Sequence, residues 1–284
     1  MTAIPVLQSI APLAATADLW FVDIWGVMHN GVRPYASSVA ACGAFRRQGG
    51  TILLVTNSPR PRESVARQLD GIGVARSAYD GIVSSGDVSR SLIEDWAGEP
   101  ILHIGPERDL PVFANLQATP GAGVADAVVA VCTGLYDDEK ETPADYAEML
   151  AKLKARDIPM ICANPDQKVE RDGRLIYCAG AIARAYEALG GTVSYAGKPF
   201  QPIYDLALEI GSDTRGKSIA KDRVLAIGDG VSTDIAGASN FGIRSVFIAS
   251  GVDVNANENV GAAAARLFAN SSAQPIAVMN GFNW

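Results

Sequence analysis

The stretch Leu19–Gly31, with the sequence LWFVDIWGVMHNG, decides the fold of this chain. It opens with the apolar run Leu19–Val22 and ends abruptly at a carboxylate, Asp23. A short apolar run bounded by turn residues predicts a strand buried on both faces, as in a parallel sheet. Open α/β sheets bind ligands at the carboxyl ends of their strands, which is where Asp23 stands. The alternative is that Asp23 only caps the next turn, since aspartate favours turns.

The composition is that of a globular protein with enough apolar residues for a large core. Apolar residues make up 48% of the 284 residues, and charges of both signs are interspersed. This length predicts one large or two moderate domains. The net charge of -7 argues against a nucleic-acid or membrane-surface partner. An anionic small substrate stays compatible with it, because a bound metal ion can reverse the local field.

The cysteines and the N-terminus predict the compartment. Cys42, Cys132, Cys162 and Cys178 contain no CxxC pair, which argues against a zinc site and a disulfide framework. We expect free thiols in a reducing compartment. No basic region followed by a long apolar core opens the chain, and no segment reaches membrane-spanning length. A cytoplasmic protein is the expectation.

Strands and helices are predicted to alternate along the chain. Apolar runs predict strands at 19–23, 51–55, 82–83, 100–104, 127–132, 158–162, 193–196, 223–227 and 245–248. Helices are predicted at 4–15, 39–48, 61–69, 88–97, 143–156, 179–189, 201–210, 231–242 and 262–269, with Ser37 or Ser38 capping the second of these. A hairpin turn is predicted at 171–174. This alternation is typical of an α/β protein with a doubly wound parallel sheet.

The rhythm restarts after Asp87 and thereby predicts the domain organisation. The simplest division is one core domain from 1–86 and 191–284, with a second, smaller α/β unit inserted at 87–190.

Four strand ends or turns carry chemically reactive side chains. Asp23 ends the first strand, and the sequence TNS at 56–58 ends the second. Lys198 lies in a glycine-lysine-proline turn, while Asp229 and Asp234 follow the strand at 223–227. Each alone has a purely structural alternative, namely a helix cap, a solvated lysine or an Asx turn. Their combination in this order favours a shared chemical site.

Phosphoryl transfer requires this set of groups together. A carboxylate can attack phosphorus and form an aspartyl-phosphate. Because its charge repels a phosphate dianion, a lysine and a divalent metal must neutralise both. Magnesium prefers oxygen ligands from one or two carboxylates, waters and the substrate phosphate. A hydroxyl and backbone N–H groups in a strand-end loop can hold the remaining phosphate oxygens.

The sequence resembles the haloacid dehalogenase superfamily of phosphohydrolases, in its class IIA, NagD-like branch. DIWGV at 23–27 is similar to the nucleophile motif, TNS to the second motif, GKPF at 197–200 to the lysine motif, and GDGVSTDIAGA at 228–238 to the acidic motif. ANPD at 163–166 is similar to a cap loop of this branch. The resemblance implies a Rossmann-like core, an inserted α/β cap domain, and a magnesium-dependent hydrolase that acts as a phosphatase.

The resemblance also implies roles for the core residues of the site. Asp23 would be the nucleophile, and Lys198 would steady it. Magnesium would be held by Asp23, the backbone carbonyl of Trp25 and Asp229, with Asp234 at or just behind the metal.

Two further pairs of residues receive roles from the same resemblance. Thr56 and Asn57 would bind the phosphoryl group. Asn164 and Asp166, in the cap loop, would face the leaving group and influence the choice of substrate.

Trp25 departs from the family pattern. Most phosphatases of the superfamily carry a second aspartate there, which protonates the leaving oxygen and then activates water. Positioned acid–base catalysis is worth roughly 100- to 10,000-fold. His29 is a candidate substitute because of its ordinary pKa range; the alternative is that it caps the turn with Asn30 and Gly31. A second hypothesis is that activated esters such as p-nitrophenyl phosphate react, whereas alkyl phosphates stall.

Two functions therefore stand side by side. The leading one is a phosphoric monoester hydrolase for a small phosphorylated metabolite, of the sugar phosphate or nucleoside monophosphate type. The alternative is a catalytically impaired homologue that only binds phosphate or a metabolite. A dinucleotide-binding protein fits poorly, because no GxGxxG follows the first strand. Related capped phosphatases often dimerise, so a homodimer is a further expectation.

Overall fold

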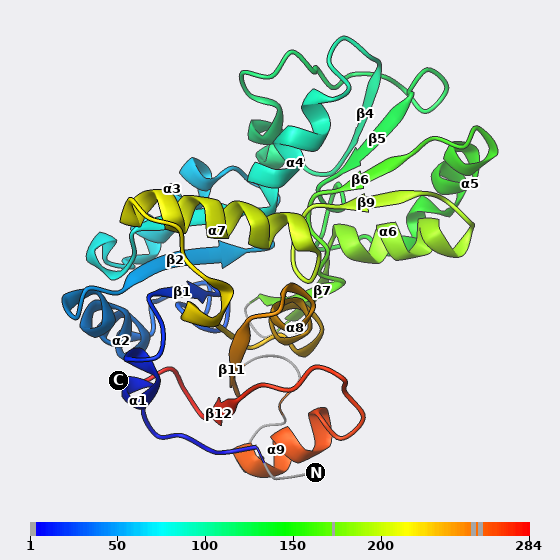
Figure 1. Cartoon of the computed structure of the whole chain (residues 1–284). Coiled ribbons are helices and arrows are strands. Elements are labelled where there is room, and N and C mark those ends of the chain that lie inside the picture. The colour runs from blue at the N-terminus through cyan, green and yellow to red at the C-terminus, as the bar shows by residue number, and fades with distance from the viewer. Residues whose placement is uncertain (1–3, 172–173, 251–253, 255–257) are drawn as a thin grey trace. The chain divides into compact units, whose positions relative to one another are not determined.

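The computed structural model describes residues 4–171, 174–250, 254 and 258–284. The two central residues of the turn expected at 171–174 lie outside these ranges. The chain forms two compact units (Figure 1). The first unit comprises 1–56, 66–83 and 198–284, and the second comprises 57–65 and 84–197. The second unit thus extends a few residues beyond the expected insert of 87–190 and also takes in the short segment 57–65.

A six-stranded sheet forms the centre of the first unit, in the order β12-β11-β10-β1-β2-β3. Its strands are β1 (Leu19–Val22), β2 (Thr51–Thr56), β3 (Gly81–Ser84), β10 (Val224–Gly228), β11 (Arg244–Ile248) and β12 (Ala277–Met279). β1 runs parallel to both of its neighbours, β10 and β2, and all four of its residues are buried. The buried parallel strand predicted at the start of the chain is therefore confirmed.

Among the described residues, six α-helices belong wholly or partly to this unit, and they differ from the predicted ones at their starts, at their ends or at both. They are α1 (Ala11–Ala14), α2 (Ala36–Arg47), α3 (Arg62–Ile72, which begins in the second unit), α7 (Gln201–Arg215), α8 (Ala236–Phe241) and α9 (Val260–Leu267). The helix predicted at 4–15 is wrong for its first half, because Val6 pairs with Val278 of β12 instead. The predicted serine cap of α2 is also wrong: the helix begins at Ala36 after Tyr35, and Ser38 is buried.

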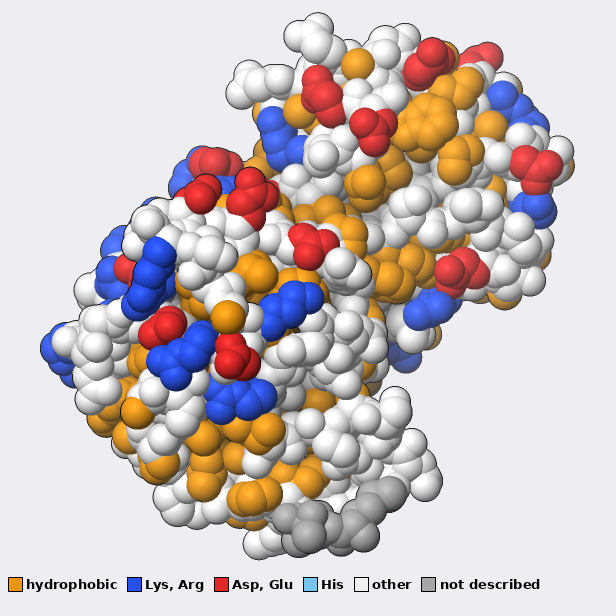
Figure 2. Space-filling view, in the orientation of Figure 1, with side chains coloured by type: hydrophobic (Ala, Val, Ile, Leu, Met, Phe, Trp, Pro, Cys, Tyr) orange, Lys and Arg blue, Asp and Glu red, His pale blue; other side chains and the backbone are white. Residues whose placement is uncertain are grey.

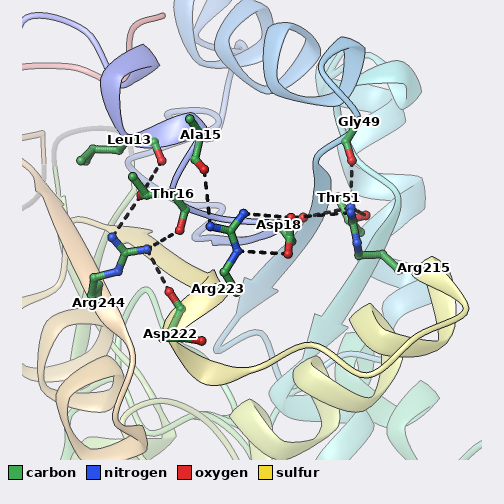
Figure 3. Close-up of polar contacts among 10 residues, drawn as sticks. All are labelled: Leu13, Ala15, Thr16, Asp18, Gly49, Thr51, Arg215, Asp222, Arg223 and Arg244. Atoms are coloured by element: carbon green, nitrogen blue, oxygen red, sulfur yellow. Dashed lines mark hydrogen bonds and ion pairs between the residues drawn. The ribbon is translucent and has the colours of Figure 1, made fainter.

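Arginines hold the amino ends of these strands together (Figure 3). Both Nε and Nη2 of Arg223 donate to the Asp18 carboxylate at 3.1 Å, and this hydrogen bonding lowers the pKa of Asp18. Arg215 donates to the backbone carbonyls of Asp18 and Gly49, and Arg244 donates to that of Thr16. This edge of the sheet is therefore occupied by structural contacts, whereas the reactive residues of the sequence follow the carboxyl ends.

The second unit is an α/β unit with its own parallel sheet, in the order β4-β5-β6-β9. Its strands are β4 (Ile101–Ile104), β5 (Val129–Cys132), β6 (Met160–Cys162) and β9 (Val193–Tyr195), with an antiparallel pair β7 (Lys168–Arg171) and β8 (Arg174–Tyr177). Its α-helices are α4 (Ser85–Glu94), α5 (Ala147–Ala155) and α6 (Ala179–Ala188). The mixed α/β class and the parallel sheets match the sequence prediction.

Alternate residues of these strands pack on opposite faces of the second sheet, as the pleat requires. Along β5, Ala130 and Cys132 belong to one core cluster with Leu150 of α5 and Ile182 of α6. Val129 and Val131 belong to the other, with Ile93 of α4. Both faces are covered, which explains why the strand sequences are continuously apolar.

The sequence predicted free cysteine thiols and interspersed charges of both signs. All four cysteines are buried free thiols, and burial raises the pKa of Cys42 and Cys132 to about 12. On the face shown in Figure 2, acidic and basic side chains are interspersed rather than gathered by sign. Among the described residues, no helix has the length and apolar character needed to cross a bilayer.

Candidate active site

The strand order of the first sheet reverses at β1, because β2 and β3 continue to one side and β10 to β12 to the other. Such a reversal opens a crevice at the carboxyl ends of the strands. Asp23 follows β1 directly, Asp229 follows β10 directly, and Thr56 is the buried last residue of β2. One carboxylate oxygen from each of Asp23, Asp229 and Asp234 lies within 4.8 Å of the others. The strand-end residues are thus brought together as predicted.

Lys198 lies among these carboxylates. Its Nζ is 2.5 Å from Oδ1 of Asp23 and 2.7 Å from Oδ1 of Asp234, and it also donates to the carbonyl of Val55 at 3.1 Å. The lysine side chain is only 4% exposed. Burial alone would lower the pKa of Lys198, but the charges of Asp23 and Asp234 raise it well above the ordinary value. The lysine is therefore a permanent cation next to Asp23.

One lysine does not neutralise three clustered carboxylates. Burial, reinforced by the charges of Asp23 and Asp234, raises the pKa of Asp229 well above 3.8. Burial also raises the pKa of Asp234 to about 6, although Lys198 opposes this. Mutual repulsion of this kind is what a divalent cation relieves, and three carboxylates are the hard oxygen donors that magnesium accepts. The donor set therefore fits a magnesium ion.

Gly26 makes room for Asp229. Its backbone has a φ of +74°, and a Cβ built on it would lie 1.8 Å from Oδ2 of Asp229. Only glycine satisfies both the left-handed conformation and this close approach. Sequence reasoning missed Gly26, although a glycine three residues after a strand-end carboxylate is a signal that could have found it.

Asp234 occupies a π-helical turn, Val231–Ile235, that precedes α8. Its Oδ2 accepts a hydrogen bond from the Gly230 N–H at 3.1 Å, while its Oδ1 accepts from Lys198. Both oxygens are therefore oriented. A continuous helix was predicted at 231–242; the π turn differs from it, and such turns are frequent at functional sites.

His29 caps a turn. Its Nδ1 accepts from the Gly31 N–H at 2.9 Å, its ring lies edge-on to that of Trp25, and the side chain is fully buried. Burial lowers the pKa of His29 to about 4, so the ring is neutral near pH 7, with its proton on Nε2. That atom is buried with no hydrogen-bond partner in the part of the chain that the structure describes. This geometry favours the turn-capping alternative over a proton carrier.

Asn57, Asn164 and Asp166 belong to the second unit and are linked there. The Asn57 side chain donates to Oδ1 of Asp166 at 2.9 Å, and Oδ1 of Asn164 accepts from the Asp166 N–H at 3.0 Å. Asn57 and Asn164 are both buried. The first bond joins residues 109 positions apart and was not predicted. It ties the ANPD loop to the residue that follows Thr56 in the chain.

Comparison with known proteins identifies the family. Residues 20–119 match haloacid dehalogenase-like hydrolases, and residues 195–274 match a second profile described as HAD-hydrolase-like. A crystal structure of a haloacid dehalogenase-like hydrolase from Brucella suis 1330 is 44% identical, covers 97% of this chain and 99% of its own, and has a TM-score of 0.87. The chain belongs to the haloacid dehalogenase-like hydrolase family, which confirms the resemblance seen in its motifs.

Two more distant relatives are named as phosphatases. A D-glycerol 3-phosphate phosphatase of Mycobacterium tuberculosis is 25% identical over 243 residues. The match covers 85% of this chain but only 65% of that relative, less than two thirds of its length. A crystal structure of a glycerol phosphate phosphatase from the same species, in complex with magnesium, is 24% identical with a TM-score of 0.71. It covers 98% of this chain and 78% of its own, and it supports the fold.

Proposed function

We propose that this chain is a magnesium-dependent phosphatase for a small phosphorylated metabolite, a sugar phosphate or nucleoside monophosphate, acting through an aspartyl-phosphate on Asp23. The observation that carries the proposal is Asp23 paired with buried Lys198 beside two further carboxylates within 4.8 Å. A buried lysine keeps a carboxylate ionised and therefore nucleophilic. The relative named D-glycerol 3-phosphate phosphatase supports a polyol or sugar phosphate.

Magnesium would be held by Asp23, Asp229 and the backbone carbonyl of Trp25, with Asp234 at or just behind it. When bound, the ion would neutralise the charge that otherwise separates a phosphate from these carboxylates. The magnesium complex of the glycerol phosphate phosphatase supports this choice of ion. Gly26 would serve the site by leaving space for the Asp229 carboxylate.

The chain's own residues account for two displacements at phosphorus. An Asp23 carboxylate oxygen forms a bond to phosphorus while the bond from phosphorus to the leaving oxygen breaks. That oxygen departs with the electron pair and takes a proton from solvent, because position 25 is tryptophan. Water then attacks phosphorus, loses a proton and breaks the bond to Asp23, which releases inorganic phosphate. Lys198 holds Asp23 in place, and Thr56 and Asn57 are proposed to hold phosphate oxygens.

The second candidate function is a protein that binds phosphate with little turnover. A specific observation keeps this function open. The Trp25 ring packs on the turn, where a Cβ on Gly31 would lie 2.9 Å from it, and it lies edge-on to His29. The indole N–H of tryptophan donates hydrogen bonds but does not titrate, so this side chain cannot supply a proton to a leaving group. Rapid turnover of alkyl phosphates would exclude the binding-only function.

Asn164 and Asp166 are proposed to influence which leaving group is accepted. Their hydrogen bonds to each other and to Asn57 would fix the ANPD loop. Replacing Asp166 with alanine should therefore change the ranking of kcat/KM among phosphorylated sugars and nucleotides. An unchanged ranking would remove Asp166 from substrate choice.

The experiment is a phosphatase assay on p-nitrophenyl phosphate and glycerol 3-phosphate, with magnesium and with chelator. We expect wild-type turnover that requires magnesium and is lost in Asp23→Asn. Asp205→Asn, an exposed aspartate on α7, is the matched control and should keep full activity. Turnover that survives in Asp23→Asn, or that is unchanged when a chelator removes magnesium, would overturn the proposal.

A further inference from the structure

Three arginines of the second unit gather around buried Asp109 and partly buried Asp138, outside the site described above. Arg60 comes from the segment 57–65, Arg108 follows β4, and Arg171 ends β7. Arg108 and Arg171 both pair with Oδ2 of Asp138, at 2.5 and 2.7 Å. Arg60 pairs with Asp109 at 4.0 Å. Three separate segments thus bring like charges to one place.

The guanidinium groups lie closer to solvent than the carboxylates do. The side chains of Asp109 and Asp138 are 6% and 9% exposed, whereas those of Arg60, Arg108 and Arg171 are 29%, 51% and 36% exposed. Burial lowers the pKa of Arg60. The charge of Asp109 opposes this shift, and the charges of Arg108 and Arg171 add to it. The cluster therefore presents a cationic face with its carboxylates beneath.

A hydrogen-bond chain fixes the base of this cluster. The Thr133 hydroxyl bonds to the Asp109 carboxylate, and Nε2 of His103 lies 2.9 Å from the Thr133 oxygen. Gly105 approaches so closely that a Cβ on it would lie 2.0 Å from that oxygen, and its φ is +152°. His103 is the third residue of β4, and Gly105 and Thr133 directly follow β4 and β5. The carboxyl ends of such strands are the usual place for ligands in a parallel sheet. Asp109 is thus preoriented toward Arg60.

We propose that Arg60, Arg108 and Arg171 form a binding site in the second unit for a small anion that carries one carboxylate. Guanidinium groups bind carboxylates with two parallel hydrogen bonds, as Arg171 does with Asp138 at 2.7 and 3.4 Å. The three cations outnumber the two carboxylates of these ion pairs, and the two oxygens of a carboxylate match the planar fork of a guanidinium group. The carboxylate could belong to a free carboxylic acid or to the phosphorylated substrate itself. The second possibility rests on the proposed function.

The test uses the intact protein and two measurements. The first is the Kd of glycolate by calorimetry, at constant ionic strength. The second is kcat/KM for 3-phosphoglycerate divided by that for glycerol 3-phosphate, which lacks the carboxylate. Both are compared among wild type, Arg60→Gln and Arg171→Gln. Arg184→Gln is the matched control, because Arg184 is an exposed arginine of α6 that pairs with Glu187 and lies over the Tyr195 ring rather than in the cluster.

We expect either the Kd of glycolate to rise or the kcat/KM ratio to fall, by about tenfold or more, in both cluster variants and not in the control. This is the value of one charge-assisted hydrogen bond. A loss of glycolate binding identifies a free acid as the ligand, and a loss confined to the ratio identifies the substrate. If neither the Kd of glycolate nor the kcat/KM ratio changes in folded variants, the cluster is a structural ion-pair network and the proposal is wrong. Arg60→Lys replaces Arg60→Gln if the latter does not fold. If wild type hydrolyses neither phosphate, the proposed function fails, and glycolate binding alone decides this proposal.

Discussion

The ammonium group of Lys198 lies 2.5 Å from Oδ1 of Asp23, although 175 positions separate the two residues. The same ammonium lies 2.7 Å from Oδ1 of Asp234, so one buried cation joins two carboxylates from separate loops. A buried ion pair gives weak net stability, but removing one partner leaves an uncompensated charge. The buried ammonium group of Lys198 therefore links Asp23 to Asp234, and removing it would leave both carboxylates without this cation.

Replacing Lys198 with methionine should damage both stability and turnover. Because two buried carboxylates would lose their cation, we expect the free energy of unfolding to fall by about 3–5 kcal/mol without metal. We expect kcat on p-nitrophenyl phosphate to fall at least ~100-fold. Urea unfolding and steady-state kinetics measure the two effects. Lys152→Met, which removes an exposed pair with Glu148, should change stability by less than about 1 kcal/mol; equal effects of the two variants would contradict this account.

Replacing Gly26 with alanine should weaken magnesium binding. Its Cβ would meet the Asp229 carboxylate at 1.8 Å and push it away. Gly49→Ala is the matched control, since Gly49 has a similar φ of +85° but no atom within 4 Å of an added Cβ. Both should lose about 1–2 kcal/mol of stability through left-handed strain. Only Gly26→Ala should raise the magnesium concentration that gives half-maximal activity, by about tenfold or more. An equal rise in Gly49→Ala would refute the role of Gly26.

The stability of the protein should respond to the protonation of His29. Its pKa of about 4 in the folded chain lies below the ordinary 6.5. As the pH falls from 6.5 towards 4, His29 therefore binds a proton in the unfolded chain but not in the folded chain. The contribution of His29 to the free energy of unfolding is thus complete above pH 6.5 and is lost towards pH 4. The loss amounts to about 3 kcal/mol. Unfolding titrations at pH 7 and 4 should show a smaller acid loss in His29→Asn, which keeps an acceptor for Gly31.

The activity of His29→Asn separates turn capping from proton transfer. If His29 only caps the turn, kcat on glycerol 3-phosphate should stay within about threefold of wild type at pH 7. His29→Ala, which lacks the acceptor, should lose more. A fall of about 100-fold or more in folded His29→Asn would instead assign acid–base catalysis to this histidine.

Replacing Trp25 with aspartate should restore the missing acid. We expect kcat on glycerol 3-phosphate to rise by about 100-fold or more, because an alkoxide leaves only with a proton. The rise in the rate of the first nitrophenolate release from p-nitrophenyl phosphate, which reports phosphorylation of Asp23, should be small, since nitrophenolate leaves unprotonated. Trp25→Asn controls for loss of the ring. Equal gains on both substrates, or equal gains in both variants, would show that proton transfer to the leaving group is not what Trp25 lacks.

The sequence predicted the helices and strands that residues close together in the chain determine. Buried parallel strands are continuous apolar runs, so β1 and β10 could be placed, and the strand-end rule then predicted that Asp23 and Asp229 meet. The helix at 4–15 was mispredicted because Val6 instead pairs with Val278, far along the chain. The start of α2 was mispredicted because the helix already begins at Ala36, so Ser37 and Ser38 lie inside its first turn and not at its N-cap.

The parts of the site that escaped prediction depend on contacts between distant segments. The bond from Asn57 to Asp166 and the approach of Gly26 to Asp229 have no signature in local propensity. The cluster of Arg60 with Asp109 likewise joins loops that only the second sheet brings together. For His29 the sequence left two alternatives open, and its hydrogen bond to Gly31 favours one of them.

The most direct test of the central claim is to trap the aspartyl-phosphate. Wild-type protein with magnesium is mixed with p-nitrophenyl phosphate, quenched in acid, reduced with borohydride and digested for mass spectrometry. The account predicts that residue 23 is recovered as homoserine in wild type and is unmodified in the Asp23→Asn control. Continued turnover with no modification of Asp23, or with modification of another carboxylate, would contradict it.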